Sequence, residues 1–198
     1  MKSKEAILKS IKKNKPAFKS LPKDFVSSTG DSEGELGTLF ETNLIRAGAE
    51  VFRVGDVSEA FSYINTKYKG VIDFEKREEW EKYSVNSAKQ DLEQIGVASI
   101  KGQFGVAENG AIWLSESNFP HRLIPFIPQE LILLLDISCI VRNMHEAYRK
   151  IKLEDIGFGI FISGPSKTAD IEQSLVYGAH GPRKSTVVLY GTPQETAD

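Results

Sequence analysis

Residues 158–190 read FGIFISGPSKTADIEQSLVYGAHGPRKSTVVLY, and this stretch decides the expected fold. The continuous apolar run at 158–162 is typical of a strand that is buried on both faces. A Ser-Gly-Pro-Ser turn follows at 163–166, and apolar residues four apart then predict a helix from Thr168 to about Gly178. Residues 186–190 predict a second strand. Two strands joined by a helix should pair in parallel through a right-handed crossover.

In that arrangement the turn at 164–168 would lie at the carboxyl end of a strand and the amino end of a helix, where open α/β sheets place ligands. Its backbone N–H groups, hydroxyls and lysine would suit an anion. The phosphate-loop and dinucleotide patterns GxxxxGK[ST] and GxGxxG are absent, however, and Asp170 and Glu172 would oppose a phosphate. The alternative is that Thr168 caps the helix while Asp170 complements its dipole. Both interpretations stay open at this point.

Helices and strands alternate along the preceding part of the chain. Helices are expected at 33–49, 58–68 and 143–153, and strands at 51–54, 71–74, 97–100 and 131–135. The run at 131–135 is the most apolar and is expected to form a central strand. Residues 105–114 predict either a bend that leads into a strand or a hairpin. The alternation predicts an α/β fold, with a mainly parallel sheet flanked by helices.

The N-terminal part has a different character. Residues 3–13 predict a short amphipathic helix, and 14–32 contain prolines, serines and a glycine, which favour an extended arm. We therefore expect an N-terminal helix and arm at 1–32, followed by an α/β domain at 33–198. Residues 75–94 are highly charged and predict a loop with some helix.

Charge and composition narrow the classes of function. A net charge of −2 and an isoelectric point near 6.0 give no electrostatic case for nucleic acid or an anionic membrane. The lysines of the first 23 residues are interpreted as a solvated helix face. No apolar run reaches the roughly 20 residues that span a bilayer, and no secretory signal is recognised. The single cysteine, Cys139, cannot form an intramolecular disulfide or hold a cluster alone, which favours a reduced cytoplasmic protein, and any iron–sulfur chemistry would have to belong to a partner.

Two further side chains could carry chemistry. Glu108, in Ala-Glu-Asn-Gly-Ala, could act as nucleophile, general base or acceptor for a ligand amine, or could be an ordinary turn carboxylate. His180 could stabilise a helix C-terminus or, with Arg183, bind a carboxylate or phosphate. The three histidines lie far apart without HxxH spacing, so no metal site is expected. A GxSxG elbow is also absent.

The run Ile-Ser-Gly-Pro-Ser-Lys-Thr-Ala-Asp-Ile-Glu at 162–172, followed by Gly-x-His-Gly-Pro at 178–182, resembles the signature of the LUD-domain family, of the lactate utilization protein C type. Ala-Glu-x-Gly at 107–110 resembles the second motif of this family, with Asn109 where threonine is usual. The resemblance implies a fold similar to ribose-phosphate isomerases, CoA transferases and formyltetrahydrofolate cyclo-ligases. It also implies a role in bacterial L-lactate oxidation to pyruvate, together with two iron–sulfur partner proteins.

The turn Glu-Asn-Gly also resembles the catalytic turn of class I CoA transferases, whose glutamate attacks an acyl-CoA. A stand-alone transferase or ligase that uses Glu108 is therefore an alternative function, and a scaffold without a ligand is another. If the chain is instead an accessory component of lactate oxidation, we expect it to bind a small anionic or nucleotide-like ligand. The expected site combines Glu108, as candidate catalytic residue, with Asn109, Gly110, Gly164, Pro165, Ser166, Lys167, Thr168, Asp170, Glu172, His180 and Arg183.

Overall fold

The computed structural model describes residues 2–16, 33–84, 86–152, 157–169, 175–178 and 180–191. Its contacts divide the chain into two units, Met1–Gly30 and Asp31–Asp198. In the first unit, helix α1 (Lys2–Lys13) forms as predicted and exposes Ile7, Leu8 and Ile11. Most of the predicted arm, residues 17–32, lies outside the described residues. Among the described helices, none is long and apolar enough to cross a membrane.

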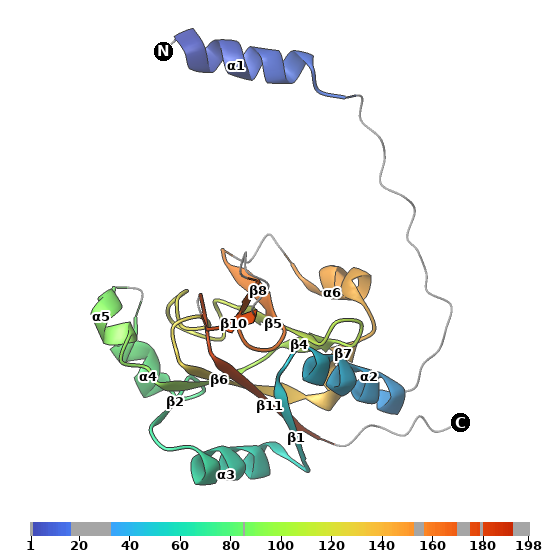
Figure 1. The fold of residues 1–198 in the computed structure, drawn as a ribbon, viewed down its shortest axis with the longest axis vertical. Helices are drawn as coiled ribbons and strands as arrows, with labels where there is room; N and C mark the ends of the chain where they lie inside the picture. The colour runs from blue at the N-terminus through green and yellow to red at the C-terminus, as the bar shows by residue number, and fades with distance from the viewer. Residues whose placement is uncertain are drawn as a thin grey trace. The chain divides into compact units, whose positions relative to one another are not determined.

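The second unit is built on a five-stranded sheet in which every pair of neighbouring strands is parallel (Figure 1). Its order is β1-β11-β6-β3-β2, and its strands are β1 (Glu50–Val54), β2 (Val71–Asp73), β3 (Val97–Lys101), β6 (Glu130–Asp136) and β11 (Lys184–Tyr190). The predicted central strand is the middle one, and its residues 131–135 are at most 1% exposed. The predicted α/β fold with a mainly parallel sheet is confirmed.

Helix α3 (Val57–Lys67) covers one face of this sheet. It begins at Asp56, whose side chain accepts a hydrogen bond from the N–H of Glu59 at 2.8 Å, the usual way to satisfy a first-turn donor. Ala60 and Ile64 of the helix pack in one apolar cluster with alternate residues of β6 and β11. Side chains alternate along each strand, so the sheet has two apolar faces, and helix α3 forms the layer that covers one of them.

The other face carries helix α2 (Glu33–Arg46) and a second sheet, which the sequence did not indicate. That sheet has the order β7-β4-β5-β8, with β4 (Phe104–Val106), β5 (Ala111–Ser115), β7 (Ile140–Val141) and β8 (Gly159–Ile162). Strands β4 and β5 are antiparallel neighbours, so the hairpin interpretation of this region is confirmed. Phe40 and Leu44 of α2 share the main core with Ile112 of β5 and Leu133 of β6. Helix α6 (Met144–Lys150) packs on the outer side of the second sheet through Ala147.

The remaining described elements are short. They are α4 (Arg77–Lys82), α5 (Lys89–Leu92), the 3-10 helix η1 (Ile137–Cys139), β9 (Lys167–Ala169) and β10 (Leu175–Tyr177). The short helices α4 and α5 agree with the expectation of a loop with some helix at 75–94. Helix α6 ends at Lys150, three residues before the predicted end, and residues 153–156 lie outside the described part.

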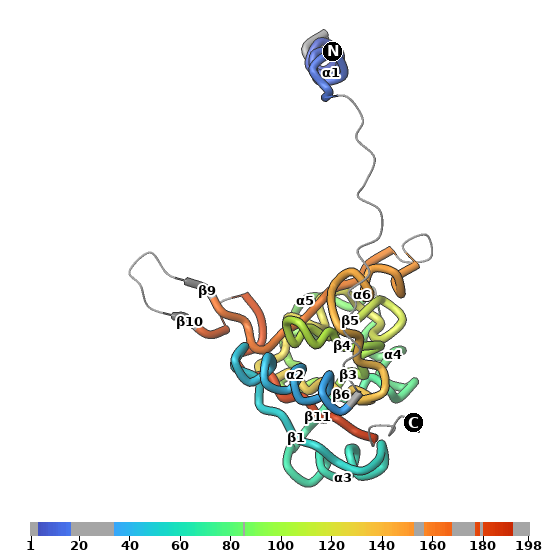
Figure 2. The backbone as a smooth tube through the Cα atoms, turned by 90° about the vertical axis from the view of Figure 1, so that its right-hand side faces the viewer, coloured from blue at the N-terminus to red at the C-terminus, as the bar shows by residue number. Residues whose placement is uncertain are grey.

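The prediction for residues 158–190 was wrong in its topology. Strand β8 belongs to the second sheet, antiparallel to β5, whereas β11 belongs to the central sheet. The predicted helix from Thr168 to Gly178 is replaced at both ends by strands, since β9 and β10 pair antiparallel to one side of the body (Figure 2). Threonine, valine and tyrosine favour strands. One pair of apolar residues at i, i+4 spacing was too little evidence to predict a helix among them. The crossover between β8 and β11 and the proposed cap at Thr168 are therefore wrong, and 170–174 lie outside the described residues.

Candidate functional site

The turn between β4 and β5 is held against the C-terminal end of α2. Asn43 donates through Nδ2 to the carbonyl oxygens of Ala107 at 2.8 Å and of Glu108 at 3.1 Å. Gly110 has a φ of +66°, and a Cβ on it would lie 2.7 Å from the backbone nitrogen of Leu44. Because a side chain at this position fits neither the conformation nor the space, Gly110 is required for the turn to dock on the helix.

The Ser-Gly-Pro-Ser turn docks on the same helix end. Ser163 donates through Oγ to the carbonyl oxygen of Asn109 at 2.9 Å. Gly164 has a φ of +71°, and a Cβ there would lie 2.5 Å from the carbonyl oxygen of Ala47. The Nζ atom of Lys167 lies 2.9 Å from the position of a Cβ on Gly48. The two motifs that the sequence singled out are thus brought together, although not through the strand–helix crossover that was predicted.

The third segment, residues 178 and 180–183, is tied to that turn by backbone hydrogen bonds through Gly178 and Pro182. Ser166 donates its N–H to the carbonyl oxygen of Pro182 at 2.9 Å and accepts from the N–H of Gly178 at 3.0 Å. Arg183 is exposed, and its backbone N–H is anchored to the carbonyl oxygen of Gln129 at 2.9 Å. His180 is also exposed. Of the predicted site residues, Asp170 and Glu172 lie outside the described part, and of Thr168 only the backbone is described.

Positive side chains gather around this helix end. Arg46 lies in the last turn of α2, where carbonyl groups carry partial negative charge, and the exposed Lys167 lies beside Gly48. Lys167 also places its Nζ 5.7 Å from the centre of the Tyr177 ring. The side chain of Arg183 lies against Gly178, on the segment that is hydrogen-bonded to Ser166. We call Arg46, Lys167 and Arg183 the cationic rim, because positive groups of this kind could attract a carboxylate or a phosphate. We call this set of turns, residues 107–110, 163–167, 178 and 180–183, the α2 loop site.

Glu108 has a structural partner that the sequence did not indicate. Its carboxylate accepts a hydrogen bond through Oε2 from the backbone N–H of Met144 at 3.0 Å, at the start of α6. Asn143 accepts from the N–H of Glu146 at 3.0 Å, and Glu146 in turn accepts from the N–H of Arg142 at 2.9 Å. Asn143 and Glu146 thus form a capping box whose return bond is shifted by one residue, from the N–H of Asn143 to that of Arg142. Glu108 is exposed and helps to cap a helix, so its carboxylate remains open to a ligand while already making one hydrogen bond.

A second group of polar residues, at the carboxyl ends of the central strands, was missed by the sequence analysis. Burial lowers the pKa of Lys101, but its hydrogen bond to Tyr190 and the charges of Glu75 and Asp136 outweigh burial and raise it above its usual value. Ser99, which is buried, donates to the carboxylate of Asp73 at 2.9 Å. A polar residue directly after each apolar run was the signal that could have revealed this group, because parallel strands end at the same edge.

These features define an α/β protein in which a parallel sheet is packed against a second sheet and polar loops gather at one helix end. The model of the LUD domain matches residues 73–190, more than half of the chain, and the chain belongs to this family. The resemblance noted from the motifs at 107–110, 162–172 and 178–182 is thereby confirmed.

Relatives within the family are named for lactate utilization. The chain is 36% identical over 111 residues to lactate utilization protein C of Shouchella clausii, covering 52% of this chain and 48% of that protein. It is 32% identical over 124 residues to lactate utilization protein C of Anoxybacillus flavithermus, covering 61% and 56% respectively. The chain thus spans about half the length of the curated relatives it matches. A DUF162 family protein from Deinococcus radiodurans has the same fold, with a TM-score of 0.59 at 16% identity, over 82% of this chain and 100% of that one.

Proposed function

We propose that this protein is an accessory component of a bacterial L-lactate utilization system and binds a small anionic or nucleotide-like ligand at the α2 loop site. The observation that carries the role is the match of residues 73–190 to the LUD domain, together with relatives named lactate utilization protein C. The ligand-binding part is supported by the bond from Ser163 to the carbonyl oxygen of Asn109, which joins the two family motifs at one helix end.

The cationic rim supplies positively charged hydrogen-bond donors for a small carboxylate. Lys167 and Arg183 can donate charge-assisted hydrogen bonds, which contribute more than neutral ones. Glu108 carries an exposed carboxylate in the turn that Ser163 contacts, so a ligand that carries both an anionic group and a hydroxyl or amine could find partners for each. A 2-hydroxy acid and a nucleotide both meet this description.

The electron carriers are proposed to lie on partner proteins in the cytoplasm. Oxidation of lactate to pyruvate releases two electrons, and the one cysteine of this chain, Cys139, is half-buried and cannot ligate a cluster alone. We therefore propose iron–sulfur partners for this chain. Affinity capture of the chain from lactate-grown cells of its source should recover cysteine-rich proteins, and a chain that is captured alone would argue against this part of the proposal.

A thermal-shift screen with L-lactate, pyruvate, nucleotides, CoA esters, folates and flavins tests the site. A ligand at a hundred times its dissociation constant should stabilise the protein by about 2.7 kcal/mol. Lys167→Ala and Arg183→Ala should each weaken binding by about 10- to 100-fold, the range for loss of a hydrogen bond to a charged group. Lys69→Ala, which removes an exposed lysine outside the α2 loop site, is the matched control and should bind normally. Equal binding by all three variants would show that the ligand binds elsewhere.

The alternative, a transferase or ligase that uses Glu108, is favoured by the exposure of this carboxylate in an Asn-Gly turn. It requires attack of the carboxylate on an acyl-CoA, which releases the CoA thiolate and leaves an acyl group on Glu108. Mass analysis after incubation with acyl-CoA would detect such an adduct in the native protein and not in Glu108→Gln. An unmodified Glu108, with lactate binding intact, leaves the first function as the better supported one.

A further inference from the structure

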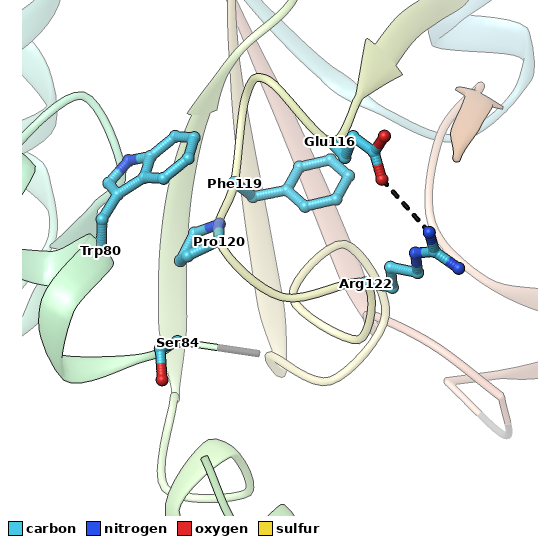
Figure 3. A pocket seen from close by; sticks show the side chains of 6 residues that line it. All are labelled: Trp80, Ser84, Glu116, Phe119, Pro120 and Arg122. Carbon is cyan, nitrogen blue, oxygen red and sulfur yellow. Dashed lines mark hydrogen bonds and ion pairs between the residues drawn. The ribbon is translucent and has the colours of Figure 1, made fainter. Parts of the chain in front are cut away.

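A cavity of about 620 Å³ lies outside the α2 loop site, between α4 and the loop that follows β5. Figure 3 shows Trp80 and Ser84 on one side, Glu116 and Arg122 on the other, and Phe119 and Pro120 between them. None of these six residues belongs to the α2 loop site. The volume falls within the range of about 300–1,000 Å³ that is usual for small-molecule sites.

The aromatic side of the cavity is fixed before any ligand arrives. The indole of Trp80 donates through Nε1 to the carbonyl oxygen of Phe74 at 2.7 Å, which fixes one edge of the ring. Phe119 is 1% exposed and packs edge-on against Phe158, with ring centres 6.2 Å apart. Phe119 is too buried to offer a face to a ligand, so the stacking surface is the half-buried indole of Trp80, and a ring that is already held loses little conformational entropy when another ring stacks on it.

The opposite side offers paired hydrogen-bonding groups. Glu116 accepts through Oε1 from the N–H of Gly157 at 2.7 Å and through Oε2 from Arg122 at 3.2 Å. These two bonds use about half of the lone-pair sites of a carboxylate, and a guanidinium has five N–H donors. The pair can therefore accept one further hydrogen bond and donate another without being broken. A free anion is a poorer match, because Glu116 already compensates the charge of Arg122.

We propose that this cavity binds a planar heteroaromatic ligand with adjacent N–H and C=O groups on one edge, as flavins, pterins and pyrimidine bases have. The ring stacks on Trp80, its N–H donates to Glu116, and its carbonyl accepts from Arg122. This site is additional to the proposed anion site, and it would give the protein a place for a redox-active or nucleoside-like ring. It does not rest on the proposed function.

Riboflavin is a suitable probe, because stacking on indole quenches flavin fluorescence and the compound carries no phosphate that would draw it to the cationic rim. The native protein should quench riboflavin with saturation. Trp80→Leu, which removes the stacking surface, should weaken binding by about 10-fold or more. Ser84→Trp, which fills the cavity without deleting any partner of Trp80 or Glu116, should abolish it. Lys167→Ala should bind as the native protein does.

A matched pair of ligands tests the edge contact. Riboflavin methylated at N3 lacks the N–H, so it should bind the native protein about 10-fold more weakly than riboflavin, and this difference should shrink in Glu116→Gln. Absence of saturable quenching at millimolar riboflavin would overturn the proposal, as would full quenching by Ser84→Trp. Quenching that is lost in Lys167→Ala but kept in Ser84→Trp would place the ring in the α2 loop site and would also overturn it.

Discussion

Replacement of Gly110 by alanine should lower the free energy of unfolding by about 3 kcal/mol or more. A φ of +66° costs a residue with a side chain about 1–2 kcal/mol, and here the new Cβ would also lie 2.7 Å from the backbone nitrogen of Leu44. Helix backbone cannot yield as a flexible side chain can, so either the β4–β5 turn or the end of α2 must move. Urea denaturation measures the loss.

Gly70→Ala is the matched control for this prediction. Gly70 has almost the same φ, +67°, but among the described residues a Cβ there would meet no heavy atom within 4 Å beyond its chain neighbours. It should therefore cost about 1–2 kcal/mol, the conformational part alone. The difference between the two variants isolates the contact with α2. Equal losses would mean that Gly110 is required only for its turn conformation and that the turn does not dock tightly on the helix.

The same docking couples stability to the α2 loop site. A displaced Gly110 would carry Asn109 away from Ser163, whose hydroxyl bonds its carbonyl oxygen. Ligand binding at the α2 loop site should therefore weaken in Gly110→Ala but not in Gly70→Ala.

The central sheet could be predicted from the sequence because its strands are continuous apolar runs. Residues 131–135 can be buried only between two covered faces, so β6 had to be central. The second sheet could not be predicted in the same way. Its strands β4 and β8 have only three and four residues, and the partner of β8, strand β5, lies far away in the chain. Such pairings depend on tertiary contacts that local periodicity does not encode.

Only part of the candidate site could be predicted, because the turns are local features of the sequence and their contacts are not. The glycines at 110 and 164 identified turns correctly, because positive φ is a local property. What these turns dock on is not local, since both meet α2, more than 60 residues earlier in the chain. The hydrogen bond from Met144 to Glu108 spans 36 residues, and nothing near Glu108 indicated it. Site residues could thus be named from motifs while their roles could not.

Replacement of Gly159 by alanine should lower the free energy of unfolding by about 2–3 kcal/mol through overpacking, because a Cβ there would overlap the indole ring of Trp113. Gly159 lies on β8 beside β5, and Trp113 is 6% exposed between the rings of Phe104 and Phe161. The indole therefore occupies the space that any side chain at 159 would need.

A double-mutant cycle with Trp113→Phe tests this explanation directly. Phenylalanine lacks the outer atoms of the indole, so the double variant should be more stable than the sum of the two single losses predicts, with a coupling of about 1–2 kcal/mol. Gly96→Ala, whose Cβ would meet no heavy atom within 4 Å among the described residues apart from its chain neighbours, should instead combine additively with Trp113→Phe. Additive losses for Gly159 as well would show that the indole yields freely, and that β8 is held by its backbone pairing with β5 more than by this contact. Coupling of the expected sign would instead mean that the indole of Trp113 on β5 can pack here only because Gly159 on β8 has no side chain. This contact then fixes the position of β8 and of the Ser-Gly-Pro-Ser turn that follows it.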